Sequence, residues 1–402
     1  MNGPLEGFRV VEFGGYIAGP GVCAHLRAMG AEVIKIEPPT GDPARRMGAY
    51  GDAIWCSFNR GKRSVVLDLQ DPGDRDAALQ LLDTADVCVQ NLRPGAVHRL
   101  GIDPETVTAR NPGMVYLSVT GFSSTGPNAK RLGLDVAVQA ESGMMSLTGE
   151  EGGNPLRVGY PIVDVASTHV GAETVLAALL GRTRTGRGRA IELSMFDVAV
   201  GLQCVPISTY LAVGREQGRR ASGSPYNAPS AEVIDTRDGQ LVLSAHVDQW
   251  RRLCAVIGRP DLTEDPRFAT NDARVAHRAE LVDTLSDVLS DMDCDSAAAL
   301  LAENAIVVGV VRSYPQLLDS AEFRHGNYLI DASLPDGRVT SAVRPPVRLT
   351  GPAGSGVTAD DALPALGGST QEVLAELRSR DGAAFAHITA GPADPQAEEG
   401  RL

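Results

Sequence analysis

The chain has 402 residues, of which 43% are hydrophobic and 22% charged, and its formal net charge is −13. This length accommodates two or three domains with a large core, and the acidic balance disfavours nucleic acid as a partner. The 44 glycines have no repeat period, which excludes collagen and solenoid architectures, and the six cysteines form no CxxC pair, so we expect neither a disulfide framework nor a metal site.

The N-terminal segment contains no basic stretch followed by an apolar run, as a signal peptide would. No apolar run approaches the roughly 20 residues that a bilayer-spanning helix needs. We therefore expect a cytoplasmic protein that does not bind a membrane.

The chain starts with a strand–turn–helix–strand pattern. Residues 8–13 predict a strand, the glycine-rich segment 14–21 a turn, residues 20–29 a helix and residues 31–37 a second strand. The glycines of the turn do not follow the GxGxxG spacing, so this motif gives no reason to expect NAD or FAD. The pattern indicates the beginning of a doubly wound α/β fold.

Strands and helices continue to alternate as far as residue 120. Strands are predicted over 63–69, 85–90 and 114–120, and a helix over 71–84. Alternation of this kind predicts a parallel sheet whose ligands bind beyond the carboxyl ends of its strands. Residues in the turns at those ends should therefore lie close together: Tyr16, Ile17, Arg45, Asn91, Arg99 and Lys130.

Two aspartates precede apolar helical patterns in the next part of the chain. Asp135 begins a glycine-bounded helix over 133–149, and Asp164 lies at or near the start of a helix that runs to Leu180. An aspartate in this position commonly caps the helix. It would also meet free N–H groups and a favourable dipole, which keep a carboxylate ionised and available as a nucleophile. The local pattern does not separate these two interpretations.

The second half of the chain predicts a smaller α+β unit. A helical run reaches about residue 213, a hairpin is expected around Asp238-Gly239, and helices follow over 248–258, 277–290 and 295–303. We accordingly predict a large α/β domain at 1–200, a linker at 201–228, a small domain at 229–310, a return segment at 311–378 that completes the large domain, and a mobile tail at 379–402.

Seven segments are distinctive in their sequence and order: RVVEFGGYIAGPGVCAHLRAMGAEVIKIEPPTGDPAR, FNRGKRSVVLDLQ, ADVCVQNLRPGAVHRLGID, GFSSTGP, GLDVAVQAESGMMSLTG, GRPDLTEDPRFATNDARVAHR and LPALGGSTQEVL. With these segments, residues 4–376 resemble the class III CoA-transferase family of the CaiB/BaiF type, which includes formyl-CoA transferase, carnitine CoA-transferase and α-methylacyl-CoA racemase. The resemblance implies a large Rossmann-like domain, a smaller α+β domain and an interlocked homodimer.

The family resemblance also implies a covalent mechanism centred on Asp164. Asp164 would attack an acyl-CoA thioester to give a mixed anhydride, and then carry CoA as an aspartyl thioester to a carboxylic acid acceptor. A carboxylate that is ionised at neutral pH needs no general base, so no catalytic triad, metal or permanently bound cofactor is expected. Coenzyme A and its acyl esters would be substrates. An anhydride must be shielded from water, and the loop 221–225 is our candidate for the shield.

The CoA contacts of the family transfer position by position to this chain. Tyr16 and Ile17 correspond to the turn at the pantetheine end, and Arg45 to a phosphate-binding arginine. The adenine- and phosphate-contacting turn corresponds to Asn91, Leu92, Ala96 and Arg99, with a further cation from Lys130 or Arg131. Asp135 corresponds to a carboxylate near the acyl site, and it is equally well explained as a helix cap.

Departures from the family pattern narrow the expected activity. The racemase branch has an acid/base histidine where this chain has Leu134, so a racemase or epimerase is the less favoured alternative. His169 lies about 140° around the helix from Asp164 and is expected to pack. Ile17 replaces a glutamine of the oxalate-specific member, which favours a less polar acyl group. A CoA-binding protein without activity is the other alternative.

Overall fold

The computed structural model describes residues 3–334, 337–344 and 362–381, which form two compact units. The first unit contains residues 1–142 and 158–204 and the chain from Tyr328 onward. The second contains Gly143–Arg157 and Val205–Asn327. Compared with the predicted domains, the segment 143–157 joins the second unit, and the return to the first unit begins at Tyr328 instead of residue 311. Most of the predicted tail, 382–402, lies outside the described residues.

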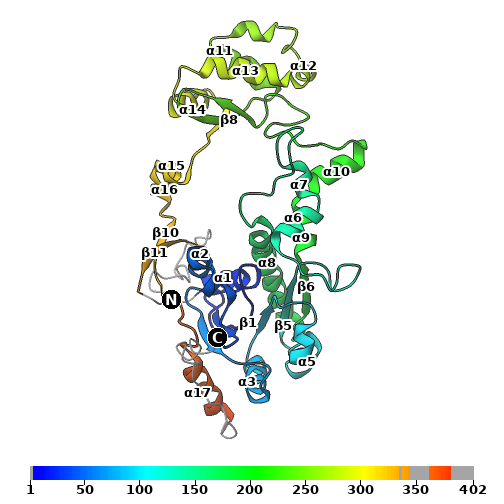
Figure 1. Cartoon of the computed structure of the whole chain (residues 1–402), viewed down its shortest axis with the longest axis vertical. Helices are drawn as coiled ribbons and strands as arrows, with labels where there is room; N and C mark the ends of the chain where they lie inside the picture. The colour runs from blue at the N-terminus through cyan, green and yellow to red at the C-terminus, as the bar shows by residue number, and fades with distance from the viewer. Residues whose placement is uncertain (1–2, 335–336, 345–361, 382–402) are drawn as a thin grey trace, which may run out of the picture. The chain divides into compact units, whose positions relative to one another are not determined.

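A six-stranded parallel sheet forms the centre of the first unit (Figure 1). Its strands are β1 (Arg9–Phe13), β2 (Glu32–Glu37), β3 (Arg63–Val66), β4 (Val87–Gln90), β5 (Val115–Thr120) and β6 (Ala190–Ser194), in the order β3-β2-β1-β4-β5-β6. Val11 at the centre of β1 pairs with Ile34 on one side and Cys88 on the other. The predicted doubly wound α/β fold is confirmed, and the strand order reverses between β1 and β4.

Helices cover both faces of this sheet. One face carries α1 (Ala18–Ala28) and α8 (Ile162–Thr185), with α6 (Asp135–Glu141) and α9 (Met195–Leu202) packed against α8. The hydrophobic core on the other face includes residues of α3 (Pro72–Asp83), α5 (Pro104–Arg110) and α17 (Thr370–Asp381), and of the short α4 (Ala96–Leu100). Asp71 and Asp103 cap α3 and α5 by accepting backbone N–H bonds.

Small residues let α1 and α8 approach closely. A Cβ at Gly21 would lie 2.2 Å from Thr168 Cγ2, and one at Gly171 would lie 2.6 Å from Val22 Cγ2. By length and composition α8 could cross a membrane, as could α9 taken together with α10 (Cys204–Val213), contrary to our expectation that no run is long enough. In this structure α8 is a core helix, because Val163, Val175 and their neighbours are buried against the sheet.

Two predicted helices are each divided. The helix expected over 133–149 ends at Glu141 and resumes as α7 (Met144–Leu147), because Gly143 between them has a φ of 83°. The helical run that ends near residue 213 is bent at Gln203 into α9 and α10. A left-handed residue interrupts the hydrogen-bond ladder, which explains the first division.

The second unit is built on a three-stranded antiparallel sheet of β7 (Glu232–Asp235), β8 (Gln240–Ser244) and β9 (Val307–Val310). The predicted hairpin around Asp238-Gly239 joins β7 to β8, with Ile234 opposite Leu241. The helices α11 (Val247–Val256), α12 (Asn271–Ala276), α13 (Arg278–Leu289) and α14 (Cys294–Glu303) supply much of its core, and α15 (Tyr314–Asp319) and α16 (Ala321–Gly326) follow.

The returning chain adds a hairpin and a helix to the first unit. The strands β10 (Leu329–Ser333) and β11 (Val339–Val343) pair and pack near Trp55 on α2 (Gly48–Phe58). The helix α17 packs beside β3 and α3. The first unit therefore contains both the N-terminal and the C-terminal parts of the described chain.

Candidate active site

The glycine-rich turn after β1 is held rigidly by side chains from other elements. The Asn91 amide accepts a hydrogen bond from Gly15 N–H at 3.0 Å and donates to the Gly15 carbonyl at 2.9 Å. Asp42 Oδ1 accepts from the Tyr16 N–H at 3.2 Å. Tyr16 has a φ of 64°, a left-handed conformation that is unfavourable for a non-glycine residue. Strain of this kind persists where surrounding contacts enforce it, and it often marks a functional turn.

A fully buried network of charges supports the same turn. Glu12 on β1 accepts hydrogen bonds from Lys35 Nζ and Lys62 Nζ, each at 2.6 Å. Lys35 also donates to the Gly14 carbonyl at 2.7 Å and contacts Asp42 Oδ2 at 2.9 Å. Burial alone would raise the pKa of Glu12, but the two ammonium groups outweigh it and lower that pKa. Burial lowers the pKa of Lys62, while its contact with Glu12 opposes that shift. Through Lys35 and Asp42, the network fixes the Gly14 carbonyl and the Tyr16 N–H of the turn.

The turn forms one wall of a cavity of about 400 Å³ at the carboxyl ends of β1 and β4, called here the β1–β4 cavity. It lies at the position where the strand order reverses, which is where doubly wound sheets bind ligands. Among the sequence-predicted residues, Tyr16, Asn91 and Leu92 line it. Arg46 and Arg93 supply its cationic groups.

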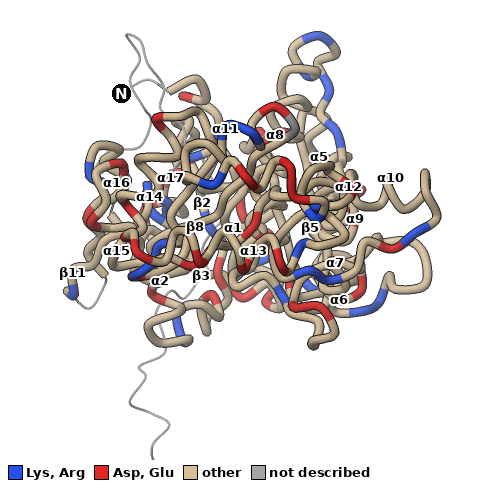
Figure 2. The backbone as a smooth tube through the Cα atoms, turned by 90° about the horizontal axis from the view of Figure 1, so that it is seen from above, with Lys and Arg blue, Asp and Glu red and all other residues tan. Residues whose placement is uncertain are grey.

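A larger cavity of about 820 Å³, the β5–β6 cavity, adjoins the first and shares Leu92 and Arg93 with it. The cations Arg99 and Lys130 line this cavity, as predicted residues of the ligand site should. It also contains carboxylates, including Glu192, which accepts hydrogen bonds from the Ser124 N–H and hydroxyl. Acidic and basic positions are likewise interspersed along the backbone of the described chain (Figure 2).

Three predicted CoA contacts have a different structural role or position. Arg45 donates to both oxygens of Glu37, at 2.8 and 2.7 Å, and its guanidinium stacks 3.7 Å from the centre of the Trp55 ring. Its charge is already balanced there, whereas the adjacent residue Arg46 lines the β1–β4 cavity. A phosphate contact of Arg45 remains a prediction. Arg131 pairs with Glu141 at 2.6 Å, and Ala96 lines neither cavity.

Ile17 connects the turn to the start of α8. Its side chain is buried in a cluster with Ala44 and Ile54, against which Val165 packs. Val165 follows Asp164 directly in the sequence. The predicted pantetheine turn and the predicted nucleophile therefore belong to neighbouring segments of one unit.

Asp164 lies in the first turn of α8, two residues after the helix begins at Ile162. The first-turn N–H groups all have acceptors: Ile162 donates to the Tyr160 carbonyl, Val165 to the Pro161 carbonyl, and Val163 and Asp164 to Asp135 Oδ2 at 2.7 and 3.1 Å. Within the described residues, the Asp164 carboxylate itself accepts no hydrogen bond. The expectation that free N–H groups stabilise this carboxylate is therefore wrong, because Asp135 occupies two of them.

The electrostatic consequence is a raised pKa. Burial, followed by the charge of Asp135, raises the pKa of Asp164 to about 7. The side chain nevertheless keeps some accessible surface, so a reactant can reach it. The expectation of full ionisation at neutral pH is also corrected, since a pKa in this range leaves part of the carboxylate protonated at pH 7.

Asp135 is the first residue of α6, but its side chain does not cap that helix. Leu134 precedes it as the N-terminal flanking residue, and the Asp135 carboxylate reaches to α8 instead. The interpretation of Asp135 as the cap of the helix that it begins is thus wrong, because its carboxylate accepts from the first turn of α8 instead. Its place in an acyl site remains a prediction.

The two histidines near this helix form a pair. The rings of His25 on α1 and His169 on α8 lie 4.4 Å apart, and His25 Nε2 contacts Thr168 Oγ1 at 3.1 Å. Burial, and secondarily His169, lower the pKa of His25 to about 4. His169 is solvent-exposed, and its ring is tilted by 39° against that of His25, so it packs on one side only.

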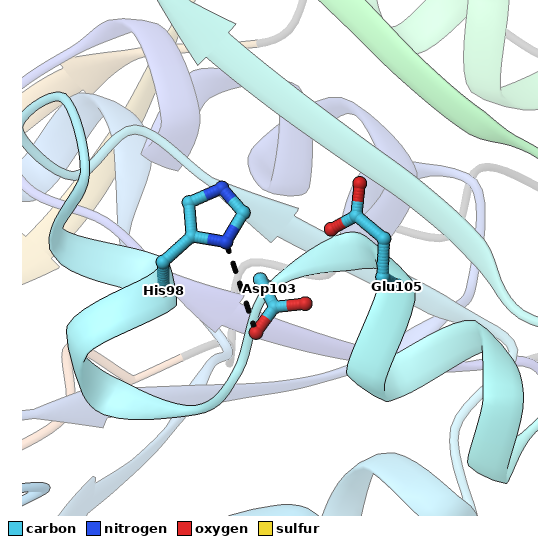
Figure 3. A group of neighbouring side chains, drawn as sticks. All are labelled: His98, Asp103 and Glu105. Atoms are coloured by element: carbon cyan, nitrogen blue, oxygen red, sulfur yellow. Dashed lines mark ion pairs between the residues drawn. The ribbon is translucent and has the colours of Figure 1, made fainter.

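One group of side chains has spacing that could hold a metal ion. His98, Asp103 and Glu105 place ligand atoms within 4.8 Å of one another (Figure 3). Both oxygens of Asp103 already accept hydrogen bonds from Thr106, through its N–H and its hydroxyl, at 2.9 Å each. These bonds explain Asp103 as the cap of α5, and the prediction that the chain needs no metal remains a prediction.

The loop 221–225 of the second unit is held by a regular set of hydrogen bonds. Gly223 N–H donates to the Ala231 carbonyl and Ser224 N–H to the Ser230 carbonyl. Arg278 donates to the Ser222 carbonyl and pairs with the buried Glu232. The role of the loop 221–225 in excluding water remains a prediction.

The sequence and the fold of this chain are both similar to those of known proteins. The model of CoA-transferase family III matches residues 5–370. The chain is 35% identical to the probable fatty acyl-CoA transferase Rv3272 of Mycobacterium tuberculosis, over 86% of this chain and 91% of that protein. It is 34% identical to the succinate–glutarate CoA-transferase of Agrobacterium fabrum, over 94% and 96%.

Solved structures agree with the sequence comparisons. A CaiB/BaiF family protein from Brucella suis superposes with a TM-score of 0.83 at 32% identity, covering 94% of this chain and all of that one. The orthorhombic crystal form of Rv3272 gives a TM-score of 0.81 at 34% identity, over 92% and 98%. With its doubly wound sheet, its cavities and this similarity along most of its length, the chain belongs to CoA-transferase family III.

Proposed function

We propose that this protein moves coenzyme A from an acyl-CoA donor to a carboxylic acid, with Asp164 as the covalent nucleophile. The observation that carries the proposal is the Asp164 carboxylate: it is partly accessible and accepts no hydrogen bond from the described residues. The next residue, Val165, packs against Ile17 in the turn that follows β1, although Asp164 itself lines neither cavity. A carboxylate that no donor stabilises is a stronger nucleophile than a solvated one.

The proposed reaction has four balanced steps. The Asp164 carboxylate attacks the donor thioester carbonyl, and the C–S bond breaks to give a mixed anhydride and CoA thiolate. The thiolate attacks the Asp164 carbonyl of the anhydride, which releases the donor acid as its carboxylate and leaves an aspartyl-CoA thioester. The acceptor carboxylate then attacks this thioester and expels the thiolate. The thiolate finally attacks the acceptor carbonyl and regenerates the Asp164 carboxylate.

The cavities suggest how the donor is held. We place the phosphates of CoA against Arg93, which lines both cavities, with Arg99 and Lys130 in the β5–β6 cavity and Arg46 in the β1–β4 cavity. The pantetheine arm would then follow the rigid turn at Tyr16 towards Asp164. A cation cluster of this kind compensates locally for the net acidity of the chain.

The raised pKa of Asp164 predicts an acid limb in the pH profile. Only the ionised carboxylate attacks, so log(kcat/KM) should fall with a slope of about one per pH unit below pH 7 and level off above it. Initial rates between pH 5 and 9, measured at low acyl-CoA concentration, test this. A limb centred near pH 4, the usual range of an aspartate, would contradict the arrangement.

The activity is tested by a screen of acids with succinyl-CoA and acetyl-CoA as donors, followed by mass spectrometry. Relatives named as transferases for glutarate, oxalate and D-citramalate supply the polar acids, and a fatty acid supplies the apolar one. We expect a new acyl-CoA, and aspartyl hydroxamate at Asp164 when hydroxylamine is added with donor alone. Acyl-CoA binding without transfer would indicate a non-catalytic protein, and α-proton exchange with deuterated solvent would indicate a racemase.

We further propose that the protein is a homodimer. The helix α10 has no buried residue and exposes Val205, Leu211 and Val213 by 71%, 76% and 59%. Such apolar exposure along one helix favours an interface. Light scattering is expected to give twice the chain mass, whereas a monomer that is active at nanomolar concentration would argue against it.

A further inference from the structure

Gln139 lies in the middle of α6. Both the nitrogen and the oxygen of its side-chain amide make hydrogen bonds near the candidate active site. The side chain is fully buried. Its Nε2 donates to Asp135 Oδ1, and its Oε1 accepts from the Val158 N–H at 2.9 Å. A buried amide that is satisfied at both ends has one orientation, and therefore fixes the groups that it contacts.

Asp135 extends this connection to α8. While Oδ1 accepts from Gln139, Oδ2 accepts from the N–H groups of Val163 and Asp164 at 2.7 and 3.1 Å. The approach segment at Val158, the helix α6 and the first turn of α8 are thus joined through two side chains. Neither side chain donates a hydrogen bond to the Asp164 carboxylate.

We propose that Gln139 is a positioning residue for Asp164: it orients the Asp135 carboxylate over the first turn of α8, and Asp135 withholds the helix N–H groups from the Asp164 carboxylate. This inference rests on the proposed role of Asp164 as nucleophile. Without Asp135 at that position, the N–H groups of the first turn would be free to bind an anion. The Asp164 carboxylate would then be stabilised and become a weaker nucleophile.

Other charged or titratable groups on the elements around α8 have separate partners or positions. On α1, His25 is bonded to Thr168 and neutral above about pH 5 because burial lowers its pKa to about 4. On α6, Glu141 pairs with Arg131. On α9, Asp197 is exposed in the first turn. Asp135 is the charged neighbour that acts on Asp164.

A double-mutant cycle between positions 135 and 139 tests the proposal. In Asp135→Asn the new amide nitrogen faces the Gln139 nitrogen, so two donors oppose each other. In Gln139→Glu two carboxylates face each other. Combining the changes restores a donor–acceptor pair with its direction reversed, and a carboxylate oxygen at position 139 can still accept from the Val158 N–H.

We expect each single variant to lose at least about tenfold in kcat at pH 8.5, with KM for acyl-CoA changed less than about threefold. The double variant should recover at least about fivefold over Asp135→Asn. The acid limb of Asp135→Asn should also move to lower pH by about one unit, because a neighbouring negative charge is gone. Losses that simply add in the double variant, or an acid limb that stays where it is in the wild type, would overturn the proposal.

The matched control is Gln203→Met. Gln203 is also buried, and its Nε2 donates to the carbonyls of Ser142 and Ala199; within the described part of the chain it makes no hydrogen bond to Asp135 or to the first turn of α8. Its removal should leave the acid limb in place. If Asp135→Asn does not fold, Gln139→Met, which keeps the volume and removes both hydrogen bonds, is expected to slow hydroxylamine labelling of Asp164 at least about fivefold.

Labelling separates this proposal from the one on which it rests. A wild-type enzyme that transfers CoA without labelling at Asp164 would refute the proposed mechanism. Labelling at Asp164 together with an unshifted acid limb and an additive cycle would refute the role of Gln139 and Asp135 alone.

Discussion

Replacing Asp164 by asparagine is expected to abolish CoA transfer and to stabilise the protein. The rate should fall by at least about a thousandfold, because the covalent route loses its nucleophile. The stability gain follows from the pKa: an unfolded aspartate has a pKa of about 4, whereas burial and Asp135 raise the pKa of Asp164 to about 7 in the folded state. The ionised carboxylate therefore opposes folding.

Because the pKa of Asp164 is higher in the folded state than in the unfolded state, the stability difference develops as the pH rises between these two pKa values. The difference in unfolding free energy between Asp164→Asn and the wild type should be near zero below pH 4, grow between pH 4 and 7, and reach about 1–3 kcal/mol above pH 7. Urea unfolding at several pH values measures it. Asp197→Asn is the matched control, since Asp197 lies in the first turn of the neighbouring helix α9 and is exposed. A gap that does not depend on pH would contradict the raised pKa.

Replacing Glu12 by glutamine is expected to cause the largest loss of stability. The change removes the carboxylate that the buried Lys35 and Lys62 share and leaves only Asp42 paired with Lys35, and breaking a buried pair in this way costs about 3–5 kcal/mol. The turn at Gly14 should loosen as well, since Lys35 holds its carbonyl, so KM for acyl-CoA should rise.

The surface pair between Arg9 and Glu32 supplies the control for Glu12. Glu32→Gln removes a partly exposed carboxylate on the adjacent strand that pairs with Arg9 and with Arg63, and it should cost about 1 kcal/mol or less. Both variants are compared by urea unfolding under one condition. Equal losses for the two would show that burial of the Glu12 network adds nothing.

The parallel sheet and the ligand-binding edge at the carboxyl ends of its strands could be predicted, because they depend on local patterns. Short apolar runs such as VVEF and DVCVQ alternate with helices, and a parallel sheet is the arrangement that buries such runs on both faces. The position of the ligand cavities follows from that topology. Predictions for Tyr16, Asn91, Leu92, Arg99 and Lys130 therefore agree with the residues that line the cavities.

The features that the sequence did not reveal are contacts between residues that are distant in sequence or that compete for one partner. Arg45 and Arg46 are adjacent, and only the position of Glu37 and Trp55 decides which of them is neutralised. The N–H groups at Asp164 are occupied by a carboxylate from Asp135, which the local helix pattern cannot reveal. Gln139 was missed because a glutamine within a helix is ordinarily exposed.

The division of the helix over 133–149 had a signal that could have been used. Gly143 lies within that pattern, and a glycine inside a predicted helix often marks its end. The boundary between the two units also falls there, at Ser142 and Gly143. Weighting this glycine more strongly would have placed residues 143–157 outside the large domain.

Following an oxygen atom of the acceptor acid tests most directly the claim that Asp164 is the covalent nucleophile. The acceptor acid that turns over fastest in the screen is prepared with heavy oxygen in its carboxylate and incubated with donor and enzyme for several turnovers. The tryptic peptide of residues 158–182, which contains Asp164, is then analysed by mass spectrometry. The anhydride mechanism predicts that the Asp164 side chain gains heavy oxygen from the acceptor. Turnover that leaves this carboxylate unlabelled would contradict it.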